Sequence, residues 1–301
     1  MLNKKQRNYI FTVRANRKGK NGENIEYVFA PPLDCDIRLS KATLLGGYNS
    51  LTIIIYNLGE DARNDLYQNM FGYTKKPQYC SFQAGYGDSL ALMYDGVVRE
   101  CYTELQGTRT ATIFNCVNII KNLKDTQISK TIIEDNLYNI IVNVINENFK
   151  DYRLNIEENT AKQLKEKVIH KPMIIFNNVY DFLIEYNVPF YIDGSVINII
   201  DEQYTYEGLS PITISSETGL LKTPKFKGNI IECDVEFEPY AILGRKAKLN
   251  STVMPQFNND DYKIVGIDHI GGFGATTRSN LITHLQLQNQ TLINQQGKIY
   301  E

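Results

Sequence analysis

Short runs in which apolar and polar residues alternate dominate the first 120 residues of the chain. The strand-like runs are Tyr9–Arg14, Ile25–Phe29, Asp36–Ser40, Ser50–Asn57, Cys80–Gly87 and Ala111–Ile119. A two-residue period is typical of strands with one buried face. The run Ser50–Asn57 is rich in β-branched residues, which predicts a strand that is buried on both faces. The first 120 residues are therefore predicted to form a β-rich region.

Two local signals interrupt this pattern. Asn57 is a suitable N-cap, and Leu58, Ala62, Leu66 and Met70 follow it at helical spacing, which predicts a short helix. An Asp-Gly pair, Asp95–Gly96, stands between strand-like flanks and predicts a hairpin turn.

The period changes after residue 120. Apolar residues recur at spacings of three and four from Ile132 to Phe149, which predicts a helix of about four turns. Thr160–Ile169 is a second candidate helix, and Asn178 is predicted to cap a third. The segment Pro189–Ile200 then has the pattern of a hairpin, with Asp193 and Gly194 at the centre of a type I′ turn. Residues 121–205 are predicted to form a small α/β module.

The C-terminal third returns to strands. A strand is predicted from Ile231 to Glu238, and Pro239 is expected to end it because proline donates no ladder hydrogen bond. Gly244 is expected to turn the chain into a second strand, and Tyr262 begins a third that ends in a flexible glycine turn, Gly271–Gly274. The tail from Asn289 is polar and is expected to fray.

Composition narrows the function classes. The formal net charge is −2, so the chain lacks the basic excess of a general nucleic-acid-binding protein. No run approaches the roughly 18 apolar residues of a membrane span, and the segment behind Met1–Arg7 is not that of a secretory signal. The five cysteines are widely spaced and are predicted to be buried reduced thiols. They are Cys35, Cys80, Cys101, Cys116 and Cys233.

Candidate chemistry is weak throughout. Asp234, Glu236 and Glu238 alternate along one strand, which suits a solvated or lumen-facing strand better than the paired acids of a glycosidase. The stretch Asn258–Asp261 lacks the spacing of a calcium loop and reads as a polar turn. The histidines His170, His269 and His284 form no zinc-binding pattern. We therefore predict no catalytic, cofactor-binding or metal-ligating residue.

A basic stretch near the N-terminus is the remaining charged feature. Its members are Lys4, Lys5, Arg7, Arg14, Arg17, Lys18 and Lys20. A solvated arm is the favoured interpretation, with contact to DNA or to an acidic partner as the alternative.

Several segments, taken in order, resemble the hub proteins of bacteriophage tail baseplates, which share a fold with the hub part of type VI secretion spike proteins. The matching segments are Leu51–Leu58, Phe82–Tyr86, Tyr94–Val98, Val179–Leu183, Gly219–Leu221, Phe237–Pro239, Leu243–Arg245 and Tyr262–His269. Each segment alone is short, and their order and spacing carry the resemblance, which extends from about residue 8 to about residue 288.

The resemblance implies a mixed α+β, mainly β fold with two tube-type β-barrel domains and an inserted α/β module. Its domains would be a first barrel at residues 1–120, the module at 121–205, a second barrel at 206–290 and a polar tail at 291–301. The structural motif residues would be Gly85, Gly219, Pro239, Gly244 and Gly266.

The resemblance also implies a non-enzymatic function. A homotrimer would form a pseudo-sixfold ring that joins a sixfold tail tube, or a tube-initiator ring, to a threefold central spike. The tape-measure protein and DNA would pass through the lumen, and the protein would act in the virion after assembly in the host cytoplasm. The sequence stops soon after the last predicted strand, so the spike is expected to be a separate protein.

Three alternatives stay open from the sequence. One is the hub of a contractile injection or type VI-like apparatus. Another is a tail-tube or distal-tail ring protein with a single barrel, although the length and the α/β module favour the two-barrel hub. The third is a cell-wall hydrolase carried on a baseplate, which the weak candidate chemistry disfavours.

Overall fold

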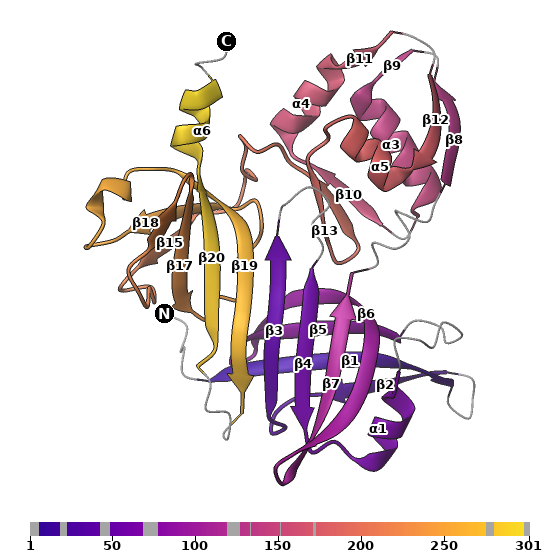
Figure 1. Cartoon of the computed structure of the whole chain (residues 1–301), viewed down its shortest axis with the longest axis vertical. Coiled ribbons are helices and arrows are strands. Elements are labelled where there is room, and N and C mark those ends of the chain that lie inside the picture. Colours follow the sequence, from indigo (N-terminus) through magenta and orange to yellow (C-terminus); the bar gives the residue numbers. More distant parts are fainter. Residues whose placement is uncertain are drawn as a thin grey trace.

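Three regions make up the computed structural model of the chain (Figure 1). It describes residues 6–18, 23–42, 49–68, 78–118, 127–132, 134–150, 152–170, 173–274 and 280–297. A large antiparallel sheet runs through the N-terminal and C-terminal regions, and the α/β module lies at one end of it. The prediction of a mainly β fold with helices in the middle is confirmed.

The N-terminal region contains seven strands and one short helix among the described residues. These are β1 (Arg7–Lys18), β2 (Asn24–Phe29), β3 (Cys35–Ala42), β4 (Ser50–Tyr56), α1 (Glu60–Leu66), β5 (Gln78–Tyr86), β6 (Ser89–Gln106) and β7 (Arg109–Val117). Their order in the sheet is β3-β4-β7-β6-β5-β1-β2. The long strand β6 bends, so that β5, β1 and β2 cross behind β3, β4 and β7 (Figure 1). A core rich in aromatic rings fills the space between these two layers.

Three local predictions for this region were wrong. In β4, Leu51, Ile53 and Ile55 are buried but the residues between them are only partly covered, so a single face is fully buried. Asn57 has a positive φ of 58° and does not cap α1, because Gly59 occupies the N-cap position. Asp95–Gly96 lies inside the continuous strand β6, paired with Ser81 and Cys80, since long-range pairing overrides the local turn signal.

The module combines short helices with small sheets. Its elements are β8 (Gln127–Ile132), β9 (Asp135–Asn136), α3 (Leu137–Asn148), β10 (Arg153–Ile156), α4 (Glu158–Glu166), β11 (Val168–Ile169), β12 (Met173–Asn178), α5 (Val179–Glu185), β13 (Phe190–Asp193) and β14 (Val196–Ile199). The predicted first helix is shorter than expected: it starts at Leu137, and Ile132 belongs to β8. The predicted cap is confirmed, because the Asn178 side chain accepts a hydrogen bond from the Asp181 amide.

The hairpin in the module is confirmed, but its turn is shifted by one residue. Asp193 pairs with Val196, so Gly194 and Ser195 form the loop. Gly194 alone has a positive φ, 61°, whereas a type I′ turn needs positive φ at both central residues. The loop therefore has the glycine-first pattern of a type II′ turn.

The C-terminal region is built from six strands. Its elements are β15 (Ile212–Ser215), β16 (Lys225–Lys227), β17 (Ile230–Glu236), β18 (Lys246–Asn250), the 3₁₀ turn η1 (Pro255–Phe257), β19 (Tyr262–Phe273), β20 (Ile282–Asn289) and α6 (Gln290–Gly297). β17 ends two residues before the predicted end, because the Glu238 amide donates to the Thr283 hydroxyl instead of a ladder carbonyl. The prediction of a glycine turn at Gly271–Gly274 was wrong, because β19 continues through Gly271 and Gly272 to Phe273. In the tail, Gln290–Gly297 form helix α6 where fraying was expected, and residues 298–301 lie outside the described residues.

The two β regions share one strand order. Across the sheet, the first region has the order β3-β4-β7-β6-β5 and the second has β16-β17-β20-β19-β18. The two orders match strand for strand when the strands of each region are numbered along the chain. The regions, called the first and second β units below, are joined edge to edge by eight residue pairs between β3 and β19. The pairing in the described residues gives one open sheet, and neither unit is found as the closed barrel that was predicted.

Candidate functional site

The front strands β17, β20, β19, β3, β4 and β7 lie side by side in the joined sheet (Figure 1), and polar side chains recur on one of its faces, called the polar face below. Side chains of opposed residues lie on the same face of a sheet. One row across it contains Asp234, His284, Asp268 and Ser40, which are paired in that order from β17 to β3. Farther along, Thr52 bonds Asn115, which donates to Glu100 on β6. Polar side chains thus extend from the second β unit into the first, with Ile282 and Ile270 as apolar members of the same face.

The buried side of the sheet contains the contacts that fasten the two β units together. The Tyr86 hydroxyl donates to the Phe237 carbonyl over 2.7 Å, across 151 residues of sequence. The Ser89 and Tyr240 hydroxyl oxygens lie 2.5 Å apart beside it. The ring of Phe237 packs within 6 Å of the rings of Tyr86, His269 and Phe273. The units are therefore held by a packed aromatic seam as well as by the β3–β19 ladder.

His269 is the buried titratable group of this seam. It is 1% exposed, and its Nδ1 lies 2.9 Å from the Thr283 hydroxyl oxygen. Burial, with a further contribution from the positive charge of Lys41, lowers the pKa of His269 to about 3. The imidazole is consequently neutral at physiological pH, and its role here is packing and hydrogen bonding.

The tip of the β13–β14 hairpin docks on the first β unit through Asp193. The Lys41 ammonium donates to both Asp193 carboxylate oxygens, at 2.9 and 3.0 Å, and the Asn49 amide donates to one of them at 2.8 Å. Asn118 adds a bond to the Ile192 carbonyl. Burial, and then the charge of Asp193, raise the pKa of the neighbouring Asp95. The module is thus fixed to the sheet by one partly buried ion pair with amide support.

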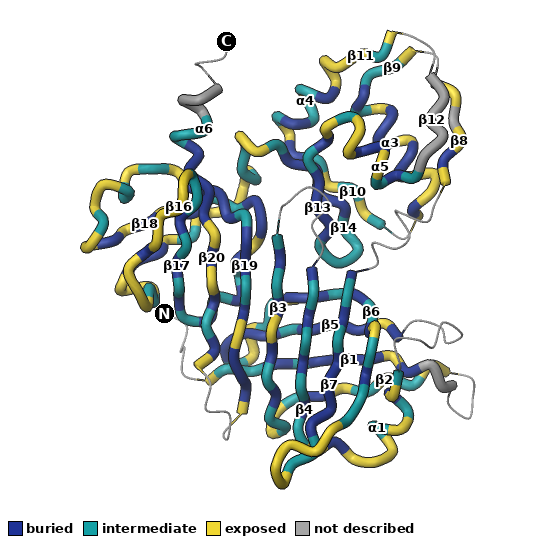
Figure 2. Tube along the Cα trace, viewed as in Figure 1, coloured by how far each residue is buried: buried dark blue, intermediate teal, exposed yellow. Residues whose placement is uncertain are grey.

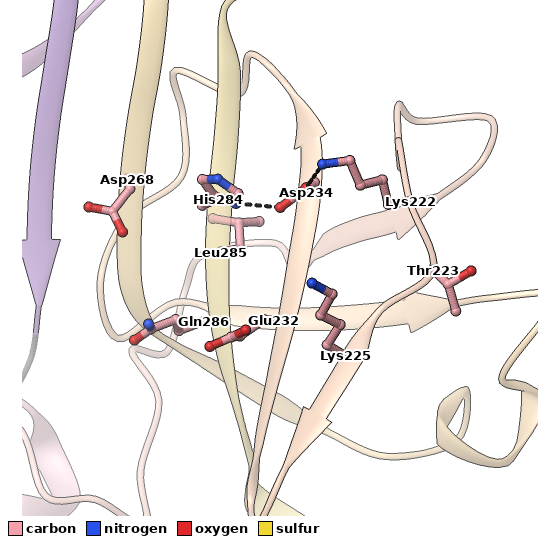
Figure 3. Close-up of a pocket in the computed structure, with 9 residues that line it drawn as sticks. All are labelled: Lys222, Thr223, Lys225, Glu232, Asp234, Asp268, His284, Leu285 and Gln286. Carbon is pink, nitrogen blue, oxygen red and sulfur yellow. Dashed lines mark ion pairs between the residues drawn. The ribbon is translucent and has the colours of Figure 1, made fainter.

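A shallow depression of about 340 Å³ opens on the polar face of the second β unit (Figure 3). Its centre is Asp234, which contacts the Nδ1 of His284 and accepts from the Lys222 ammonium at 2.8 Å. Partial burial alone would raise the pKa of Asp234, but the hydrogen bond from Lys222 and the proximity of His284 outweigh it, so the pKa is lowered. The lining residues are Lys222, Thr223, Lys225, Glu232, Asp234, Asp268, His284, Leu285 and Gln286.

This depression does not have the geometry of a hydrolytic site. Asp234 already pairs with the Lys222 ammonium and contacts His284, and its lowered pKa favours the ionised form over the protonated form that a general acid requires. Glu236 alternates with Asp234 on β17, whereas Glu238 lies beyond the end of the strand. All three acids are only partly exposed, and Asp234 is the more covered member of its ion pair with Lys222, with 16% of its side chain exposed.

The other candidate groups are not brought together. His170 lies near Glu134 on the module, far in sequence and fold from His269 and His284. Within the described residues, no group of three or more His, Cys, Asp or Glu side chains has the arrangement of a metal site. All five cysteines are buried free thiols, as predicted.

The remaining polar segments have structural roles. Asn258 bonds the Ser251 backbone, and Asp260 accepts from Asn289, so this stretch is the predicted polar turn. In the basic stretch, Arg7 and Arg14 lie in β1, where Arg14 pairs with Glu26 at 2.8 Å. Lys4, Lys5 and Lys20 lie outside the described residues, and Arg17 and Lys18 end β1.

The five predicted motif residues occupy tight places. A side chain at Gly85 would approach the Ser89 carbonyl oxygen to 2.0 Å, and one at Gly266 would meet the Gln286 side chain at 2.5 Å. Gly219 and Gly244 have positive φ, 108° and 80°. Pro239 is buried in the corner between β17 and β18. The sequence analysis did not predict the seam formed by Tyr86, Phe237 and His269, because these contacts join segments far apart in the chain.

Solved structures with the same fold come from phage tails and related secretion machines. The chain matches the 43 kDa tail protein of prophage MuSo2 from Shewanella oneidensis with a TM-score of 0.60 at 10% identity, covering 93% of this chain and 96% of that one. The E. coli c3393 protein, a component of the type VI secretion system, matches with a TM-score of 0.54 at 11% identity over 86% and 74% of the two chains. A tail protein from Neisseria meningitidis MC58 matches with a TM-score of 0.54 at 8% identity over 93% and 96%.

These matches show a fold that phage tail proteins and a type VI secretion component also have. The sequence model of the baseplate hub gp41 family matches residues 11–270, and the chain belongs to that family. No match was found among the curated proteins. Among the described residues, no helix has the length and apolarity that crossing a membrane requires.

Proposed function

We propose that this protein is the structural hub of a phage-like tail baseplate and that three copies form a closed ring between the tail tube and a central spike. The supporting observation is the repeated strand order of the two β units, joined edge to edge in one sheet. Each copy offers two similar units, so a threefold ring presents six of them. Such a ring can stack on a sixfold tube with one face and receive a threefold spike with the other. Cyclic closure also covers sheet edges that would otherwise stay exposed.

The polar face is the proposed wall of the central passage. Acidic side chains recur on it at Glu232, Asp234, Glu236 and Asp268, and cationic ones at Lys225, Lys227 and Arg38. A wall of such mixed charge lacks the basic excess that binds the phosphate backbone strongly, so DNA and an extended tape-measure protein can slide past it. The spike and the tube are proposed to be separate proteins.

A hub of a contractile injection or type VI-like apparatus is the second candidate. One observation favours it: the fold also matches the Francisella PdpA–VgrG complex, with a TM-score of 0.56 at 8% identity over 95% of this chain and 58% of that one. The genes that surround this one would separate a virion from an injection apparatus. In both cases the protein is proposed to have no enzymatic activity.

Native mass spectrometry and class-averaged electron images of the protein, alone and co-expressed with its spike and tube proteins, test the proposal. We expect a threefold ring with a central hole. A protein that stays monomeric in every combination would contradict it.

A further inference from the structure

We propose that the ring closes by pairing of β16 of one copy with the end of β6, residues 102–106, of the next copy. The occupant of each edge is thus a second copy of this chain. The inference rests on the proposed function, because it specifies the contact between copies in the ring.

The repeated strand order identifies the two edges. Within one chain, the first strand of the first unit, β3, pairs with the fourth strand of the second unit, β19. The corresponding contact between copies joins the first strand of the second unit, β16, to the fourth strand of the first unit, β6. The contact within the chain is therefore a template for the contact between chains.

The part of β6 that corresponds to the β3-binding part of β19 has an edge that no described strand pairs with. β19 pairs with β18 only at its start, Tyr262 and Lys263, and its later part accepts β3. β6 likewise pairs with β5 over residues 89–98, and with β7 over residues 97–106. On the side away from β7, the Gln68 backbone bonds Cys101. Beyond Cys101 no described strand pairs with that side of β6, and β16 has β17 as its one strand partner in the described residues.

Strand direction is compatible with this closure. Every step from β16 through β17, β20, β19, β3, β4 and β7 to β6 is antiparallel. β16 and β6 therefore run in opposite directions. A further antiparallel pair between copies continues the alternation, as β3 and β19 do inside the chain.

Charge on the polar face of the two edges is complementary. β16 presents Lys225 and Lys227 there. Lys227 already pairs with Glu232, and the nearby Lys222 with Asp234, so the positive charge that the edge can offer to a partner comes from Lys225. The polar face of β6 carries Glu100 and Glu104, and Arg99 is the cation at the bulge next to them. The adjacent helix α1 adds Glu60, Asp61 and Asp65 against Arg63. A basic edge at one end of the sheet and an acidic edge at the other favour head-to-tail contact between copies.

Each edge also exposes one large apolar side chain on the opposite face. Phe226 in β16 is 44% exposed and stacks on Phe257, and Leu105 in β6 is 73% exposed. The end of β6 and the turn after it are exposed in Figure 2. Pairing of the two edges brings these side chains to the same side of the junction, as Leu39 and His269 are in the β3–β19 contact, where both are buried.

Proline substitution tests the backbone pairing. Alternate residues of a strand direct their backbone groups to opposite sides, and the Gln68 contact shows that Cys101 faces away from β7. The Leu105 amide therefore also faces outward. Leu105→Pro removes a donor from the free edge while sparing the β7 ladder, and Leu105→Ala is the matched control. We expect Leu105→Pro to lower the trimer fraction in native mass spectra about tenfold or more, with an unchanged melting temperature of the monomer.

Two further variants identify the partner edge. Lys225→Glu and Glu104→Lys should each weaken the ring, and their combination should restore it, whereas Lys248→Glu on the exposed part of β18 should have no effect. Phe226→Cys combined with Leu105→Cys should give covalent trimers with a flexible bis-maleimide. Each single variant should give no product larger than a dimer.

The outcomes separate this inference from the proposed function. A ring that forms normally in Leu105→Pro and yields no trimeric cross-link would overturn the edge pairing while the hub function stands. A wild-type chain that forms no ring with any partner would overturn both.

Discussion

The two β units share a strand order but differ in how completely each is covered. Behind its front strands, the first unit has a second layer formed by β5, β1 and β2, and Tyr9, Phe11 and Phe82 fill the space between. In the corresponding position, the described part of the second unit has the two short strands β15 and β18. A common topology is thus combined with unequal cores.

The core of the second unit is completed by residues of the neighbouring regions. Tyr191 and Ile200 of the module belong to its core cluster. In return, its own Phe237 and Phe273 are buried in the core of the first unit. The comparison indicates that the first unit is more self-sufficient and that the second depends on the module and the seam.

The strongest test of this dependence is Phe237→Ala. The ring is 1% exposed and packs against three other aromatic rings, so its removal should destabilise the seam by about 3–5 kcal/mol. Chemical denaturation should show the second unit unfolding before the first. The control is Phe226→Ala, where the ring is 44% exposed and a loss below about 1 kcal/mol is expected for the monomer. Equal losses in the two variants would show that the seam does not hold the units together.

Acid should weaken the same seam through His269. The unfolded histidine takes up a proton below about pH 6.5, but the folded one does so only near its pKa of about 3. Between these values the unfolded state binds more protons, so stability falls as the pH falls, by up to about 1.4 kcal/mol per pH unit from this group. Denaturation at pH 4 to 7 should give a shallower pH dependence for His269→Gln than for the wild type. Identical slopes would exclude His269 as the origin.

Gly244→Val tests the packing of Gly244 against Tyr206, which follows the module and accepts a hydrogen bond from its Tyr191. Gly244 has a φ of 80°, and a β-carbon there would lie 2.7 Å from the Tyr206 ring. We expect a cost on the order of 1–3 kcal/mol and loss of ring assembly, with the helices of the module still folded. Gly208→Val is a matched control, because φ is 81° but no atom lies within 4 Å of the added carbon. If both variants melt alike, backbone strain alone accounts for the effect and the Tyr206 contact does not matter.

The smallest expected effect concerns the polar face. Replacement of Asp234, Glu236 and Glu238 by alanine should leave peptidoglycan clearing at zero, because the wild type should have none. The variant should differ in solubility or assembly at most. Reproducible clearing by the wild-type protein that is lost in the variant would contradict a purely structural hub.

The strands were predictable because alternation reports directly which residues face a core. The alternating run Asp36–Ser40 lies in β3 as predicted. The cap at Asn178 was also predictable, because a helix cap depends on residues that are close together in the sequence. Asp95–Gly96 was not, since its turn signal is outweighed by pairing with β5 and by space: a side chain at Gly96 would meet the Val117 carbonyl oxygen at 2.8 Å. The turn at Gly194 shifted by one residue because the register of β13 and β14 fixes it.

The seam and the joined sheet could not be predicted from local sequence patterns. Leu39 pairs with His269 across most of the chain, and no periodicity in either strand names the other as its partner. The repeated strand order is likewise invisible in sequence, because the two units conserve connectivity without an evident repeat of residues. The resemblance to baseplate hubs supplied the two-unit architecture but placed it in closed barrels, whereas the described strands form one open sheet.

The β3–β19 ladder also has a mechanical consequence. Hydrogen bonds in an antiparallel pair lie perpendicular to the strands. A pull directed along β3 against β19 loads all eight residue pairs in shear at once, whereas a pull across them opens the pairs one after another from an end. The joint between the two units is therefore stiff in one direction and weak in the other, so the direction of an applied force decides whether the joint transmits the load or tears.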